Sequence, residues 1–167
     1  MSNPAELFNR HHLSVFRYLR RMAGSDEQAE DLTQEVFLRV LRSPPSDPDL
    51  REKAWLFRTA RNLLLNLRRD EARRPFPDEL REPPPRPPAR AEAMDLEQAL
   101  AGLDGADREA FLMREVGGLG YSEIAAICKL TPDAVRSRIH RARLALREAL
   151  SEEVRRRPRR PSTEARS

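Results

Sequence analysis

Residues 120–150, which read GYSEIAAICKLTPDAVRSRIHRARLALREAL, decide the fold. Ile124 and Ile127 have the spacing of one apolar face on a short helix, and a tight turn follows them. Thr131 is a favoured N-cap residue, and Pro132 stands at the first helical position, where a backbone N–H is not needed. A short helix, a tight turn and a longer capped helix together predict a helix-turn-helix.

The longer helix separates its apolar residues from its basic ones. Apolar residues recur at spacings of four, three and four, which predicts a buried stripe consisting of Val135, Ile139, Ala142 and Leu146. Arginine can bind a guanine edge through two hydrogen bonds, so a helix with Arg and Ser in its first turns suits the major groove of DNA. The candidate DNA contacts are Arg136, Ser137, Arg138, His140, Arg141 and Arg143. A solvated basic face on an ordinary bundle helix is less favoured, because the cap, the turn and the short preceding helix occur together.

The rest of the chain also has the period of helices. Three helices are expected in the first part of the chain, and two more over residues 94–103 and 108–116. The expected buried residues of the first helix are Phe8, Leu13, Phe16 and Leu19. Those of the second are Leu32, Val36, Phe37, Val40 and Leu41. Those of the third are Trp55, Leu56, Ala60, Leu63, Leu64 and Leu67. No stretch alternates as a strand would, so the predicted fold class is all-α.

Prolines divide the chain into two small helical domains. Seven of the 14 prolines lie within residues 75–88, and proline both blocks helix formation and removes a backbone donor. We therefore expect helical domains over residues 1–74 and 93–152, joined by an extended Pro-rich linker over residues 75–92. Residues 153–167 are expected to form a disordered Arg-rich tail.

Charge is distributed unevenly along a chain whose formal net charge is +4. Residues 1–50 carry six Arg against eight acidic residues, whereas residues 51–74 carry eight Lys and Arg against three acidic residues. An acidic first part joined to a basic strip favours different partners for different faces, with nucleic acid for the basic one. Solubility alone is the alternative that charge leaves open.

The sequence has no motif that would carry chemistry. It has no Gly-rich phosphate loop with Lys, no His/Cys cluster at metal spacing and no nucleophile beside a plausible base, so we expect no enzyme, catalytic residue, metal or cofactor. The single cysteine, Cys128, excludes an internal disulfide and suits a reducing compartment. Without a run of roughly 18 apolar residues or a secretory leader, the expected location is the cytoplasm, with no membrane insertion.

Three stretches resemble extracytoplasmic-function (ECF) sigma factors of the sigma-70 family, which direct bacterial RNA polymerase to promoters. Residues 103–143, LDGADREAFLMREVGGLGYSEIAAICKLTPDAVRSRIHRAR, resemble the family's fourth conserved region, although Lys129 and its neighbours replace the usual turn glycine. Residues 26–41, DEQAEDLTQEVFLRVL, are similar to its polymerase-binding helix. Residues 54–69, AWLFRTARNLLLNLRR, are similar to its promoter-melting and −10-reading helix. The resemblance implies two helical domains, regions 2 and 4, in the family's order.

The resemblance also implies a role for each of three faces. Asp31, Gln34 and Glu35 lie at i, i+3 and i+4 on one helix face, and the resemblance implies that they dock on a coiled coil of the polymerase's largest subunit. In the last helix, the resemblance places Arg136, Ser137, His140 and Arg141 at or near the −35 promoter element. The residues expected at the −10 element are Trp55, Arg58, Arg61, Asn62, Asn66, Arg68 and Arg69.

Three of these residues have a second reading. Trp55 is placed both for the core and for bracing an unstacked base. Asn62 is equally placed for a local hydrogen bond within its helix. His140, alone on a polar face, suits a solvated side chain or a phosphate contact better than a base contact.

The partners that the resemblance implies are the RNA polymerase core, promoter DNA and an anti-sigma protein. A stand-alone helix-turn-helix repressor would use the same second domain, but the polymerase-docking residues of the first domain disfavour it. A nuclease is a more distant alternative. It would need a carboxylate cluster for metal, and the acidic residues here fall on exposed helix faces or in the linker.

Overall fold

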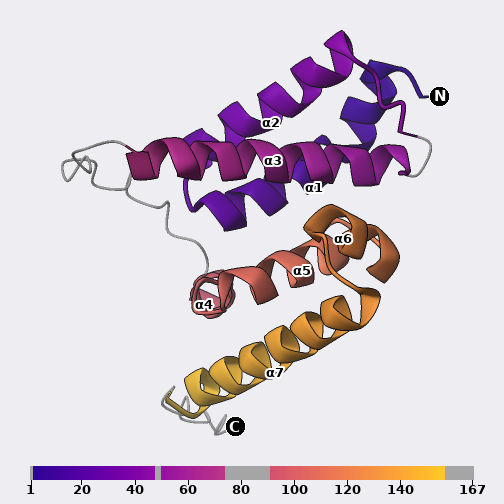
Figure 1. Cartoon of the computed structure of the whole chain (residues 1–167). Helices are drawn as coiled ribbons and strands as arrows, with labels where there is room; N and C mark the ends of the chain where they lie inside the picture. The colour runs from indigo at the N-terminus through magenta and orange to yellow at the C-terminus, as the bar shows by residue number, and fades with distance from the viewer. Residues whose placement is uncertain (1, 48–49, 74–90, 157–167) are drawn as a thin grey trace, which may run out of the picture.

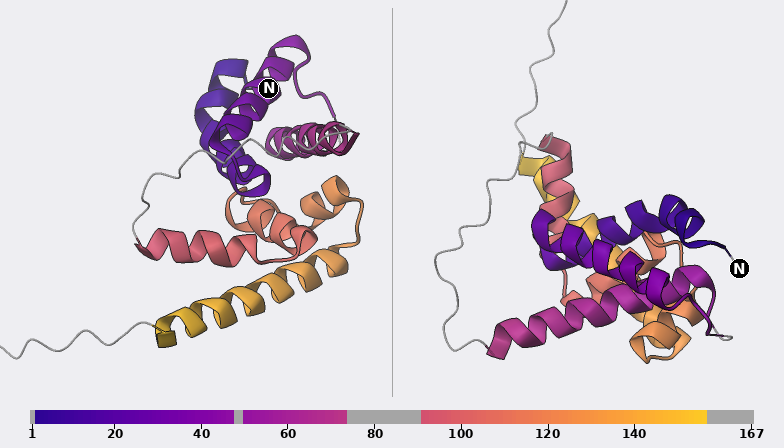
Figure 2. Two further views of the ribbon diagram at one scale, coloured as in Figure 1. Left: turned by 90° about the vertical axis from the view of Figure 1, so that its left-hand side faces the viewer. Right: turned by 90° about the horizontal axis from the view of Figure 1, so that it is seen from above.

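The computed structural model describes residues 2–47, 50–73 and 91–156, and the all-α prediction is confirmed over these ranges (Figure 1). There the chain forms seven helices and no strand. They are α1 (Pro4–Ala23), α2 (Asp26–Arg42), α3 (Glu52–Arg73), α4 (Ala91–Ala101), α5 (Gly105–Glu115), α6 (Tyr121–Cys128) and α7 (Pro132–Arg156). Helices α1–α3 form an N-terminal group and α4–α7 a C-terminal group, as Figures 1 and 2 show from three sides.

Local signals set the junction between α1 and α2. The Asn3 side chain accepts a hydrogen bond from the Glu6 backbone N–H at 2.9 Å, which caps the start of α1. Gly24 ends α1 with a left-handed φ of 78°, a conformation that glycine adopts at no steric cost. Ser25 then caps α2 by accepting from the Gln28 N–H at 3.4 Å. The two helices are therefore antiparallel neighbours joined by a minimal turn.

The predicted buried face of α1 is partly wrong. Phe8 and Leu13 are 44% and 49% exposed. Leu13 lies on the far side of the helix from the buried face, and Phe8 borders an open pocket between α1 and α2. The residues that α1 buries are Leu7, Val15, Tyr18, Leu19 and Met22.

On α2 and α3 most of the predicted core residues are buried. The exceptions are Leu41, which is 64% exposed, and Trp55 and Leu67, which are half-buried. Phe57, which the prediction did not include, is fully buried. Helix α3 contacts α1 and α2 on one side and α6 on another, so it buries more than one face. Phe57 precedes Ala60 and Leu64 by three and seven residues, so it lies on the same face of α3 as these predicted core residues.

The helix-turn-helix is confirmed in α6 and α7. Lys129 ends α6 in a left-handed conformation, with φ 56° and ψ 48°, at the place where the family's turn glycine is missing. The Thr131 hydroxyl oxygen accepts from the Ala134 N–H at 3.2 Å and so caps α7, as predicted. The predicted stripe of α7 is buried along its whole length.

Replacing Lys129 by glycine is expected to raise the free energy of unfolding by about 1 kcal/mol, because a side chain with a Cβ is strained at positive φ. Urea denaturation followed by circular dichroism measures the change. Lys129→Ala, which removes the charge but keeps the Cβ, should give no such gain. A loss of stability in Lys129→Gly would mean that the lysine side chain itself stabilises the turn.

Two predicted boundaries shift. Helix α4 begins at Ala91, inside the predicted linker, and α7 continues to Arg156, four residues beyond the predicted end at 152. The start of the expected disordered tail is therefore helical, and Ser151 Oγ donates to the Arg147 carbonyl at 2.7 Å within that helix. The predicted linker up to residue 90 and the tail from residue 157 lie outside the described residues.

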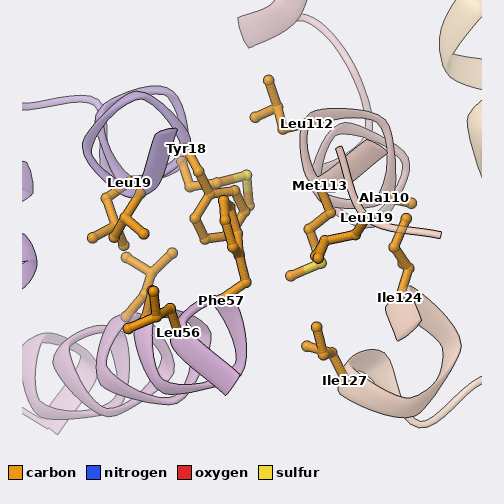
Figure 3. Packing of buried hydrophobic residues seen from close by; sticks show 14 of the residues in the cluster. Tyr18, Leu19, Leu56, Phe57, Ala110, Leu112, Met113, Leu119, Ile124 and Ile127 are labelled. Atoms are coloured by element: carbon orange, nitrogen blue, oxygen red, sulfur yellow. The ribbon is translucent and has the colours of Figure 1, made fainter. Parts of the chain in front are cut away.

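The two groups pack directly against each other. Helix α1 lies against α5, and α3 lies against α6. Tyr18 and Phe57 of the N-terminal group face Met113 and Leu119 of the C-terminal group, and all four side chains are fully buried (Figure 3). A Cβ placed on Gly117 would lie 3.0 Å from Phe57 Cζ, so the approach is close. An apolar contact thus joins the groups.

Candidate polymerase and nucleic-acid interfaces

The three predicted polymerase-docking residues lie on one side of α2. Asp31 and Gln34 are exposed, and Glu35 is half-buried. The Glu35 carboxylate accepts from Arg39 Nε at 3.4 Å and lies 3.8 Å from Arg42 Nη1. Asp31 and Gln34 are therefore presented to solvent, while Glu35 is already held by two arginines of its own helix.

An apolar pocket of about 450 Å³ opens beside Gln34, between α1 and α2. Its walls include Phe8, Phe37, Leu38 and Leu41. Sequence reasoning missed this pocket because it assigned Phe8 and Leu41 to the core. The available signal was the excess of apolar residues on α2, since a single buried stripe cannot accommodate both Leu38 and Leu41.

Most of the predicted −10 residues lie along the solvent side of α3. Asn62, Asn66 and Arg69 are exposed, and the Arg69 guanidinium donates to Asn66 Oδ1. Arg68 is also exposed, and its Nη2 donates to the Met22 carbonyl at 2.6 Å. This hydrogen bond connects α3 to the end of α1. This part of α3 offers amide and guanidinium groups to a ligand from one side.

The other three predicted −10 residues are more enclosed. Trp55 is half-buried at the edge of the core. Arg58 Nη1 donates to Asp47 Oδ2 at 2.9 Å, within the N-terminal group. Arg61 donates from Nε to Glu109 of α5, so its guanidinium lies at the contact between the two groups. The structure does not present Arg61 to solvent with its neighbours.

At the start of α7, the predicted −35 residues are accessible. Arg136 donates to Asp133 at 2.9 Å, and its guanidinium lies 5.3 Å from the centre of the Tyr121 ring. Both contacts orient the guanidinium while leaving the Arg136 side chain 60% exposed. Ser137 and His140 are exposed on the same helix.

Two of the predicted −35 arginines brace α7 against α5. Arg141 donates two hydrogen bonds, at 3.1 and 3.3 Å, to the Asp107 carboxylate, and this contact raises the pKa of Arg141. Arg143 donates to Glu115 at 2.8 Å. Arg138 is half-buried. Arg136 is therefore the arginine of this set best placed to reach a base edge.

Two negative findings concern the described residues only. They contain no group of three or more His, Cys, Asp or Glu residues that could hold a metal ion. None of the helices in the described ranges has the length and apolar character needed to cross a membrane.

Comparisons with known proteins divide the chain at the same place as the structure. Residues 7–74 match Sigma-70 region 2, and residues 93–146 match Sigma-70 region 4. The first match covers α1 from Leu7 onward together with α2 and α3, and the second covers α6 and α7 as far as residue 146.

Similar proteins match along most of the chain. SigE of Mycolicibacterium smegmatis, an ECF RNA polymerase sigma factor, is 35% identical over an alignment of 156 residues, and the match covers 87% of this chain and 61% of SigE. SigL of Mycobacterium tuberculosis, another ECF sigma factor, is 31% identical over 87% of this chain and 88% of its own length. The sigma factor CarQ of Myxococcus xanthus is 34% identical over 88% of each chain.

Solved structures agree with the fold. The sigma factor RpoE in complex with the anti-sigma factor NepR from Bartonella quintana matches with a TM-score of 0.73 over 88% of this chain and 96% of its own, at 24% identity. CnrH, in complex with the cytosolic domain of CnrY, matches with a TM-score of 0.69 over 90% of this chain and 88% of its own, at 27% identity. With both conserved regions present in order, this chain belongs to the family of ECF RNA polymerase sigma factors.

Proposed function

We propose that this protein binds the RNA polymerase core through α2 and directs it to promoters through α3 and α7. The observation that carries the proposal is the presence of both sigma-70 regions on one chain, each with its exposed polar helix. A stand-alone repressor would account for α6 and α7 but would leave region 2 without a role. The protein acts in the cytoplasm and contributes no catalytic residue of its own.

The docking surface consists of the polar face at Asp31, Gln34 and Glu35 together with the adjoining apolar pocket. A polar rim beside an apolar hollow is the usual anatomy of a protein–protein interface. Polymerase would bind the polar face and place an apolar side chain in the pocket. Exposed Leu38 and Leu41 would then be covered only in the complex.

The −10 element is bound by α3 in this proposal. Asn62, Asn66 and Arg69 present hydrogen-bonding groups along its exposed side, where bases taken out of the opening duplex would be captured. Unpairing costs a few kcal/mol for each flipped base, and contacts to the captured base offset that cost. Trp55, at the edge of the core, is placed to brace the melted strand.

The −35 element is bound by the first turns of α7. Arg136 is the candidate base-reading residue, with Ser137, His140 and the braced arginines near the phosphates. Neither helix needs to bind tightly alone, because linkage raises the effective concentration of the second contact. A protein partner of the anti-sigma type belongs to the proposal as well, since the similar CnrH was solved with a bound protein domain.

Arg136→Ala is expected to weaken binding of the holoenzyme to promoters with the preferred −35 sequence by about 1–3 kcal/mol. Competition binding against promoters with a scrambled −35 element measures the sequence dependence. Arg147→Ala is the matched control, because it removes the same charge from the same exposed face about three turns further along α7. An equal loss on all sequences would make Arg136 a phosphate contact.

DNA footprinting tests the proposed function against the repressor alternative. The protein alone should leave promoter DNA unprotected, and protein with polymerase core should protect both promoter elements. A footprint by the protein alone, unchanged when polymerase is added, would favour the repressor.

A further inference from the structure

Tyr121 connects the short helix α6 to the side of α7 that is proposed to bind DNA. It is the first residue of α6, its side chain is half-buried, and α6 packs against α7 (Figure 1). The guanidinium carbon of Arg136 lies 5.3 Å from the centre of the Tyr121 ring, and that of Arg114 lies 4.8 Å from it. Both distances fall within the range of a cation–π contact. One ring of α6 therefore contacts an arginine of α5 and an arginine of α7.

The framework of the C-terminal group fixes the position of this ring. The Gly120 N–H donates to Glu123 Oε1 at 3.2 Å, which anchors the backbone where α6 begins. Arg114 Nη1 donates to the Leu119 carbonyl at 3.0 Å, and Leu119 is fully buried. The start of α6 and Arg114 thus hold the ring in place, and the ring in turn limits the orientations open to Arg136.

Arg136 is held at two points and stays accessible. Its Nη1 donates to Asp133 Oδ1 at 2.9 Å, and its guanidinium carbon lies over the Tyr121 ring. The Asp133 side chain is 91% exposed, and exposed ion pairs contribute little, so the half-buried ring is the firmer of the two contacts. The Arg136 side chain keeps 60% exposure. An arginine can lie over an aromatic ring and still present its in-plane N–H groups to an acceptor.

A second predicted −35 residue lies near the same ring. Arg143 is about two turns beyond Arg136 and shares its face of α7. The hydrogen bond from Arg143 to Glu115 is the main cause of its raised pKa, and the nearby Tyr121 side chain raises that pKa further. Tyr121 therefore lies along a face of α7 that carries two of the predicted DNA contacts.

We infer that Tyr121 is a positioning residue for −35 recognition: its ring holds the guanidinium of Arg136 in the orientation that reads a base edge. A free arginine side chain loses conformational freedom when it orders on a base, and ordering it beforehand lowers that cost. Tyr121 acts in this way through Arg136 and not through a base contact of its own. The inference rests on the proposed function, because Arg136 reads a base only within it.

Tyr121→Leu should reduce the preference of the holoenzyme for the correct −35 sequence over a scrambled one roughly two- to fivefold, the effect of losing one exposed cation–π contact. Tyr121→Phe keeps the ring and should keep the preference. Competition binding to promoters that differ only in the −35 element measures both variants. A wild-type preference in Tyr121→Leu overturns the inference, and so does an equal loss in Tyr121→Phe and Tyr121→Leu.

The Arg136→Ala background separates positioning from a direct or purely structural role. If Tyr121 acts through Arg136, adding Tyr121→Leu to Arg136→Ala should not lower the preference further. A further loss as large as that in the wild-type background would overturn the inference. Tyr121→Met serves as a second variant without a ring, since its flexible apolar side chain fills irregular space, and circular dichroism checks that both variants keep their helices.

The same binding experiment distinguishes the inference from the proposed function. A wild-type holoenzyme without any −35 preference would contradict the proposed role of α7 and, with it, the positioning role. A wild-type preference that falls in Arg136→Ala and persists in Tyr121→Leu would overturn the positioning role alone.

Discussion

Replacing Phe57 by alanine is expected to lower the free energy of unfolding by about 3–5 kcal/mol, the usual cost of truncating a buried aromatic side chain. Phe57 is fully buried and makes an edge-to-face contact with Tyr18, with ring centroids 5.4 Å apart. It also lies against Gly117 of the C-terminal group. The substitution therefore leaves a cavity between the two groups.

Urea denaturation of the full chain measures this loss. Leu65→Ala on the same helix is the control, because Leu65 is 37% exposed and its truncation should cost well under the Phe57 value. A loss below about 1 kcal/mol in Phe57→Ala would mean that the groups do not pack as described.

The double substitution Gln34→Ala/Glu35→Ala is expected to weaken binding to the polymerase core by about 2 kcal/mol or more, roughly 30-fold, while the fold stays intact. Gln34 lies at the border between the polar face of α2 and the apolar pocket, so its loss affects the centre of the proposed interface. Fluorescence anisotropy with purified core measures the affinity, and circular dichroism checks the fold.

Two further variants serve as controls for the double substitution. Glu152→Ala removes the same charge from an exposed position on α7 and should leave polymerase binding unchanged. Glu35→Gln keeps the shape and removes only the charge, which Arg39 and Arg42 already neutralise in part, so it should cost less than the double substitution. Wild-type affinity in the double variant would remove this face from the proposed interface.

The helices themselves were predictable because their signals are local. Thr131 as a cap and the stripe from Val135 to Leu146 depend on residues close in sequence, and both are confirmed. The left-handed Lys129 shows that the turn is kept without glycine. Helix ends were less predictable, since nothing between residue 152 and Arg156 stops α7.

Contacts between helices that are far apart in the sequence were not predictable from the sequence. The period of α1 allowed Leu13 in the core, but the helices that cover α1 leave it on the far side. The contact of Phe57 with Gly117 of the other group is one that no local pattern encodes. Arg61 and Glu109 are 48 residues apart in the sequence. Sequence analysis therefore assigned Arg61 to DNA and could not indicate that Glu109 accepts a hydrogen bond from it. Most of the predicted docking and DNA residues lie on exposed helix faces, which supports the proposal, and their roles stay predictions.

In-vitro transcription tests the central claim most directly. Purified polymerase core would be supplied with a library of the host's promoter DNA, with and without this protein. Discrete transcripts that appear only with the protein, and whose start sites share two upstream sequence elements, are the predicted result. An unchanged set of transcripts would contradict the claim that this chain directs polymerase to promoters.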